Sequence, residues 1–290
     1  MSNVENIMNN CPSFRLFKYW FIREWSDDPL NNIFDVLDRN TGELLYSNID
    51  FDHYDPKVYT EEVYSDFELY KTRPEYQIGL PVDLSDKTKD NLVMIYESLI
   101  TGINMIRRFK HKQDPDDITR TIQTCNWLES GDFYSAPAST RFHDAYESGL
   151  LLHTLNVYNE CCKLWHLDKF NSVNCDSFAL VTLVHDWCKI GLYESYMRNV
   201  KDESTGTWNQ VKSYKWSDKG PAFPFGHGAT SMFLVSRFFS LTVEESLAIR
   251  WHMGWCNVAD NESSDLQSAN ERYPLVHLVQ FADQLSIVSY

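Results

Sequence analysis

The chain has 290 residues, of which 43% are hydrophobic and 14% aromatic, so it can bury one large core or two smaller ones. Its formal net charge of −15 argues against a broad positive surface for nucleic-acid backbones, and we expect no nucleic-acid partner. The amino terminus is polar and no long apolar run is present, so we expect neither a secretion signal nor a membrane span and place the protein in the cytoplasm.

Residues 1–112 are predicted to form a mixed α/β region, to which we assign no chemistry. Strand-like residues occupy 14–25, and the runs 33–37 and 43–46 are typical of a hairpin because a turn segment with a glycine separates them. From Ser85 onward, apolar residues recur at helical spacing, which predicts a helix through the rest of this region.

Residues 113–290 are predicted to form a helical domain, which makes the expected fold class mainly α. Helical periodicity, capping residues and glycine stops predict helices at 117–130, 146–166, 176–190, 228–239, 243–252 and 274–288. Residues 208–224 are expected to be a long aromatic loop.

The seven cysteines lack the paired spacing of a zinc site, and their number is odd in a chain without a secretion signal. We therefore interpret them as reduced thiols. Cys125, Cys161 and Cys188 fall on apolar faces of predicted helices, where ordinary packing is the simplest role.

Histidines and aspartates interrupt the apolar segments of the second half at several helices. His185 and Asp186 follow a run of seven apolar or small residues, where an ionised carboxylate is costly unless it is paired or binds a metal. The candidate metal ligands are His153, His185, Asp186, His227, His252 and Asp283.

Imidazole and carboxylate donors suit Mn, Fe, Co, Ni or Zn, with Mg as a further candidate. Two ions are favoured over one, because a carboxylate can bridge them and their four positive charges exceed the two negative charges of the aspartates. The excess matches an anionic phosphate ester.

Each residue alone has an ordinary explanation. His153 could be a core histidine, His227 a turn residue before a helix, and His252 a cation favoured by the carboxyl end of a helix. The prediction therefore depends on the set of six.

Three stretches of the second half resemble the HD-domain superfamily of metal-dependent phosphohydrolases. They are YESGLLLHT at 146–154, LVHDWCKIG at 183–191 and FAD at 281–283, and the likeness extends over roughly residues 135–290. The segments around His227 and His252 resemble the extra histidines of the two-metal branch, and the closest local likeness is to bacterial and phage HD hydrolases.

The resemblance implies a metal-activated water as the nucleophile, with Asp186 bridging the ions and Lys189 as a second catalytic residue that contacts phosphate or the carboxylate. Arg141, His143 and Arg250 are candidate phosphate-binding residues, although each could equally be a surface salt-bridge partner. Trp208, Trp216 and Phe223 could form a lid over a base or pack against the N-terminal part. The implied substrate is a nucleotide or a related small phosphate ester.

Two other functions remain open at this point. The superfamily also contains di-iron oxygenases with the same ligand order, and a non-catalytic module that binds a nucleotide or a protein is a third reading. All six positions are filled, which disfavours a module that has lost its chemistry.

Overall fold

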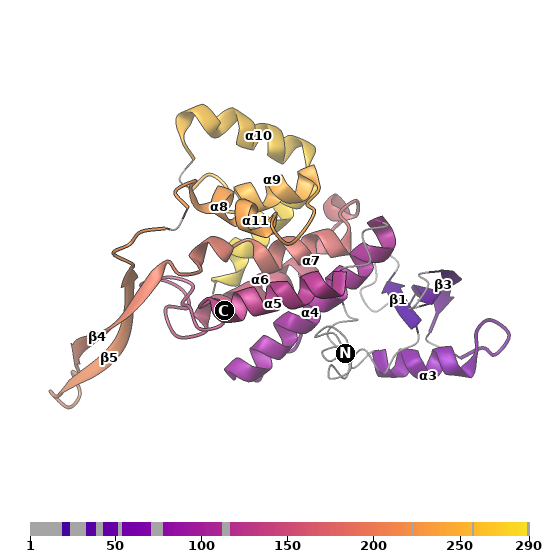
Figure 1. Ribbon diagram of the computed structural model, residues 1–290, viewed down its shortest axis with the longest axis horizontal. Helices are drawn as coiled ribbons and strands as arrows, with labels where there is room; N and C mark the ends of the chain where they lie inside the picture. The colour runs from indigo at the N-terminus through magenta and orange to yellow at the C-terminus, as the bar shows by residue number, and fades with distance from the viewer. Residues whose placement is uncertain are drawn as a thin grey trace.

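The computed structural model describes residues 19–23, 33–38, 43–51, 54–70, 78–111, 117–221, 223–256 and 258–288. Within these ranges the chain is mainly α, as predicted, with two small antiparallel sheets (Figure 1). The helices are α3 (Glu61–Tyr70), α4 (Lys89–His111), α5 (Asp117–Ser130), α6 (Gly149–Trp165), α7 (Cys175–Val184), α8 (His227–Val235), α9 (Val243–Trp251), α10 (Ser263–Arg272) and α11 (Pro274–Ser286). The strands are β1 (Tyr19–Arg23), β2 (Ile33–Asp38), β3 (Leu44–Asp50), β4 (Tyr193–Lys201) and β5 (Trp208–Trp216).

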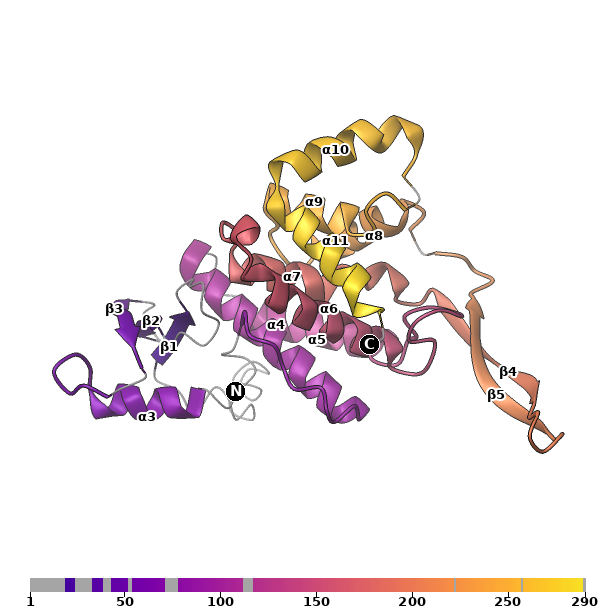
Figure 2. The same ribbon diagram turned by 180° about the vertical axis from the view of Figure 1, so that it is seen from behind.

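Helices α6 and α7 lie at the centre of the helical part, because most residues of α6 and all residues of α7 are buried. Every residue of α7 is buried. Helix α4 packs against α7 and α5, and α11 packs against α6 and α9, so that the central pair is covered on several sides (Figures 1 and 2). This burial fixes the backbone from which the histidines project.

The small N-terminal sheet has the order β1-β2-β3 and packs with α3 around its own aromatic core. The rings of Phe51 and Phe67 stack at 3.9 Å, and Phe34 meets both edge-on. The antiparallel pairing of β2 with β3 confirms the predicted hairpin, whose turn at 39–42 lies outside the described residues. The predicted strand at 14–25 is described only over β1.

The predicted boundary at 112/113 falls on residues 112–116, outside the described residues, and stays a prediction. Helix α4 nevertheless shares the core of the helical part, through Leu92, Leu99 and Ile103. Arg107 near its end pairs with Glu245 of α9 and donates to the Ser240 carbonyl at 2.7 Å. Residues from 78 onward thus pack with the C-terminal helices.

Three expectations about single elements were wrong. The segment expected as an aromatic loop contains β5, which pairs with β4 over nine residues in a hairpin that projects from the helices (Figure 1). The helix expected at 176–190 begins at Cys175 and ends at Val184, and a separate 3₁₀ turn follows over Trp187–Lys189. Helix α10 was not expected.

Within the described residues, no helix combines the length and apolar character needed to cross a bilayer.

Candidate metal centre

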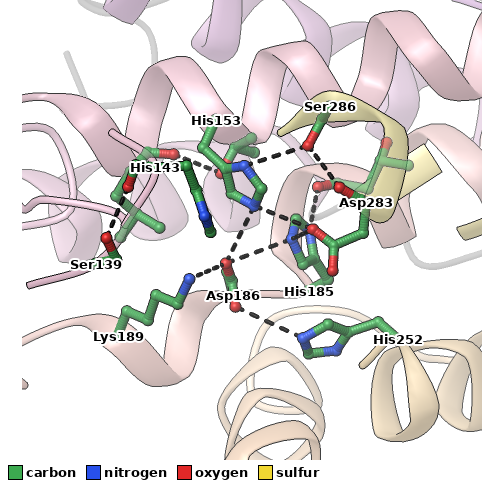
Figure 3. Close-up of polar contacts among 12 residues, drawn as sticks. Ser139, His143, His153, His185, Asp186, Lys189, His252, Asp283 and Ser286 are labelled. Carbon is green, nitrogen blue, oxygen red and sulfur yellow. Dashed lines mark hydrogen bonds and ion pairs between the residues drawn. The ribbon is translucent and has the colours of Figure 1, made fainter. Parts of the chain in front are cut away.

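The structure brings all six predicted ligands together from five different parts of the helical domain. His153 projects from α6 and Asp283 from α11, while His185 and Asp186 follow the last residue of α7. His227 is the first residue of α8, and His252 follows the last residue of α9. Figure 3 shows most of these side chains converging around Asp186.

One oxygen of Asp186 faces the first group of donors. Its Oδ2 lies 3.5 Å from Nε2 of His153 and 3.5 Å from Nε2 of His185. Asp283 completes the group, because its Oδ1 lies 3.2 Å from Nε2 of His153 and 4.0 Å from Nε2 of His185. We call these four residues the first pocket.

The other oxygen of Asp186 faces a second group. Its Oδ1 lies 2.9 Å from Nε2 of His227 and 3.6 Å from Nε2 of His252. The Sγ of Cys188 lies 3.2 Å from Nδ1 and 3.5 Å from Nε2 of His227. We call Asp186, Cys188, His227 and His252 the second pocket.

Three of the donor distances around Asp186 match those of ligands that share a metal ion. Two ligands bound at about 2.0–2.1 Å to a tetrahedral ion are separated by about 3.4 Å. The distances from Asp186 to His153, His185 and His252 lie within 0.2 Å of that value. The geometry therefore allows a carboxylate bridge between two ions.

Two histidines are held in the tautomer that metal ligands require. Nδ1 of His185 lies 2.7 Å from the Thr182 carbonyl, and Nδ1 of His252 lies 2.8 Å from the Ile249 carbonyl. A carbonyl only accepts, so each Nδ1 carries the proton and each Nε2 presents a lone pair. Both Nε2 atoms are buried and make no hydrogen bond to the described residues. Buried acceptors of this kind are what a metal ion would satisfy.

The carboxylates of Asp186 and Asp283 stay ionised because positively charged groups lie beside them. Burial alone would raise the pKa of Asp186, but Lys189 and the neighbouring histidines bring it well below its usual range. The same competition between burial and His153 lowers the pKa of Asp283. Both groups therefore offer negative oxygen donors at neutral pH.

The pKa of His153 is raised, in contrast to the lowered pKa values of the two carboxylates. Burial would lower the pKa of His153, but its contacts with Asp186 and Asp283 raise it to about 9. Burial dominates at His185 and lowers the pKa of that imidazole. Without bound metal, His153 thus carries the proton that sits between the two carboxylates.

Lys189 is buried beside Asp186 and does not lie on the surface. In the 3₁₀ turn, residues three apart eclipse one another, and Nζ of Lys189 lies 2.7 Å from Oδ2 of Asp186. Burial would lower the pKa of Lys189, but this carboxylate raises it. The ammonium group therefore holds the Asp186 carboxylate through a direct ion pair.

Gly228 allows the start of α8 to lie close to the end of α9, and these two helices carry the histidines of the second pocket. A Cβ on Gly228 would lie 2.0 Å from the Arg250 carbonyl oxygen, so only glycine allows α8 to start this close to the end of α9. The rings of His227 and His252 consequently lie 5.1 Å apart.

The three candidate phosphate-binding residues have different surroundings. The ring of His143 lies 4.8 Å from that of His153, and its buried Nε2 makes no hydrogen bond to the described residues. Burial, and secondarily the positive charges of His153 and Lys189, lower the pKa of His143. Arg141 is exposed, whereas Arg250 donates to Glu262 at 2.6 Å and stacks on Trp251. Of the three, His143 lies beside the metal centre.

The loop aromatics form no lid in this structure. Trp208 and Trp216 are exposed at the ends of β5, and Phe223 packs against the helical core.

Two residues at the site were not predicted from the sequence: Cys188, and Ser286, whose hydroxyl lies 3.4 Å from Nδ1 of His153. Ser286 follows Asp283 by three residues, so the helical period of α11 could have indicated it.

Comparison of the chain with protein-family models, curated proteins and solved structures found no match.

Proposed function

We propose that the protein is a metal-dependent phosphohydrolase with an HD-type helical domain, which cleaves a phosphate ester of a nucleotide or a related small molecule. The observation that carries the proposal is the position of Asp186. Its two oxygens face two separate sets of histidines, and Oδ2 also contacts the buried ammonium group of Lys189.

His153, His185, Asp186 and Asp283 would hold one divalent ion, and Asp186, His227 and His252 a second. Such ions lower the pKa of a bound water and place positive charge against phosphoryl oxygens. This charge matters because the chain carries a formal net charge of −15 and would otherwise repel an anionic ester.

The protein's own groups would perform the remaining tasks. Lys189 holds the Asp186 carboxylate in place through the contact at 2.7 Å. His143 presents a buried Nε2 beside His153, where it can hydrogen-bond a phosphoryl or leaving-group oxygen. Arg250 contributes to positioning α9 through Glu262 and Trp251, so we assign phosphate binding to His143 first.

The test uses full-length protein stripped of metal and reloaded singly with Mn²⁺, Fe²⁺, Co²⁺, Ni²⁺, Zn²⁺ or Mg²⁺. Each sample is assayed with p-nitrophenyl phosphate, its bis-ester and a panel of nucleotides. We expect metal-dependent release of product, abolished in Asp186→Ala and retained in Asp265→Ala, which makes the same chemical change at an exposed position of α10. A folded Asp186→Ala protein with full activity would refute the proposal.

The same samples separate hydrolysis from the di-iron oxygenase alternative. Hydrolysis requires no dioxygen and proceeds with redox-inert ions such as Zn²⁺ or Mg²⁺. An oxygenase would consume dioxygen, and only with iron. Substrate-dependent oxygen uptake without phosphate release would replace our proposal with that alternative.

A further inference from the structure

Cys188 is positioned by the same 3₁₀ turn that carries Lys189. Its backbone N–H donates to the Ser231 hydroxyl at 3.0 Å, which ties the turn to α8. Its buried Sγ lies 3.2 Å and 3.5 Å from the two ring nitrogens of His227. The thiol thus faces the second pocket instead of filling an apolar contact between helices.

Three donors meet at this position. A carboxylate oxygen of Asp186, Sγ of Cys188 and a ring nitrogen of His227 all lie within 4.8 Å of one another. His252 supplies a fourth donor. Its side chain is 1% exposed, and its Nε2 makes no hydrogen bond to the described residues. That lone pair lies 3.6 Å from Oδ1 of Asp186 and needs a partner.

One sulfur–nitrogen distance matches a single ion with mixed ligands. With bond lengths of about 2.3 Å to sulfur and about 2.0 Å to nitrogen, a tetrahedral ion separates these donors by about 3.5 Å. The distance from Sγ of Cys188 to Nε2 of His227 is 3.5 Å.

We propose that Cys188 is a thiolate ligand of the second pocket and completes a donor set of two imidazoles, one carboxylate and one sulfur with Asp186, His227 and His252. The inference rests on the metal centre of the proposed function and refines its metal preference. Binding breaks the S–H bond, and the proton leaves to solvent as the sulfur–metal bond forms.

The two pockets then differ in chemical softness. His153, His185, Asp186 and Asp283 offer only nitrogen and oxygen, which also suit harder ions such as Mn²⁺. A thiolate favours Zn²⁺, and by the same softness Co²⁺ or Fe²⁺, over Mg²⁺. We therefore assign an ion of the softer kind to the second pocket.

The experiment detects the sulfur directly and does not require activity. Full-length protein is stripped of metal and loaded with Zn²⁺ for X-ray absorption, or with Co²⁺ for optical absorption. Wild type should show a sulfur scatterer at about 2.3 Å from zinc and a thiolate-to-cobalt charge-transfer band in the near ultraviolet. Cys188→Ser should lose both signals, while Cys256→Ser, which alters an exposed thiol, should keep them.

Affinity gives a second measurement. In Cys188→Ser, Zn²⁺ affinity of the second pocket should fall by more than about 10-fold, the lower end of what loss of an outer-shell partner costs. Mg²⁺ affinity should change little. Circular dichroism and thermal unfolding of the metal-free variants check that the fold is retained.

The outcomes separate this inference from the proposed function. Absence of a sulfur signal in wild type, or its persistence in Cys188→Ser, overturns the ligand role even if hydrolysis is observed. A sulfur signal that depends on Cys188, without hydrolysis of any ester, supports the ligand role and contradicts the proposed hydrolase function. If Cys188→Ser fails to fold, absence of a sulfur signal in wild type still overturns the inference, and Cys188→Ala provides the comparison when the signal is present.

Discussion

Nζ of Lys189 lies 2.7 Å from Oδ2 of Asp186, and both side chains are buried among the ligands of the metal centre. The pair places a fixed positive charge on the carboxylate that faces both pockets. Its removal would leave a buried anion with one cation fewer, which is more costly than loss of an exposed ion pair.

Lys189→Met should therefore destabilise the metal-free protein, by about 3 kcal/mol in the free energy of unfolding. Bound divalent ions replace part of the lost charge, so the deficit should be smaller in the loaded protein. Urea denaturation with and without metal measures both values. Equal stability of Lys189→Met and wild type without metal would show that the pair is not needed to hold Asp186.

Metal affinity should rise with pH between about 7 and 9. The contacts with Asp186 and Asp283 raise the pKa of His153 to about 9, and an ion must displace that proton to use Nε2. Affinity for the first pocket should increase by about 10-fold per pH unit and level off above pH 9. Chelator-competition titrations measure this, and an affinity that is flat across the range would contradict the prediction.

Gly228→Ala should weaken the second pocket selectively. The added methyl group would meet the Arg250 carbonyl oxygen at 2.0 Å and push α8 away from α9, which separates His227 from His252. We expect a loss of about 1–3 kcal/mol in stability together with loss of one of two bound ions. Metal stoichiometry is the measurement, and Ala229→Ser, which adds one atom in the same turn, is the control.

Residues 78–290 should fold without the preceding region, whereas residues 113–290 should not. The shorter chain lacks α4, so Glu245 would lose Arg107 and the core would lose Leu99 and Ile103. Circular dichroism and thermal unfolding of both chains distinguish the cases. Cooperative unfolding of residues 113–290 at the temperature of the full chain would place the boundary where the sequence predicted it.

The sequence predicted which histidines and aspartates the structure brings together, because each lies within a helix or close to one of its ends. His153 and Asp283 lie on faces that helical periodicity assigns to the interior, and the structure places both there. Cys188 was assigned to packing because the helix was expected to continue to residue 190. The chain instead tightens after Val184, which turns the thiol toward His227.

Other elements gave a weak signal because few of their side chains are buried. Strands β4 and β5 are exposed along most of their length, so the alternation of apolar and polar residues that marks a half-buried strand is missing. Helix α10 buries only Leu266 and Ala269, too few to establish a period. Pairing partners and tertiary contacts, rather than local composition, decide such segments.

The shared carboxylate of Asp186 has a thermodynamic consequence. An ion in either pocket would change the orientation and the charge of the anion on which the other pocket depends, so the two binding equilibria would be linked. Linkage is reciprocal. If an ion in the first pocket changes the affinity of the second pocket by some factor, an ion in the second pocket changes the affinity of the first by the same factor. Loading of the centre is then one coupled process, and a single side chain sets its cooperativity.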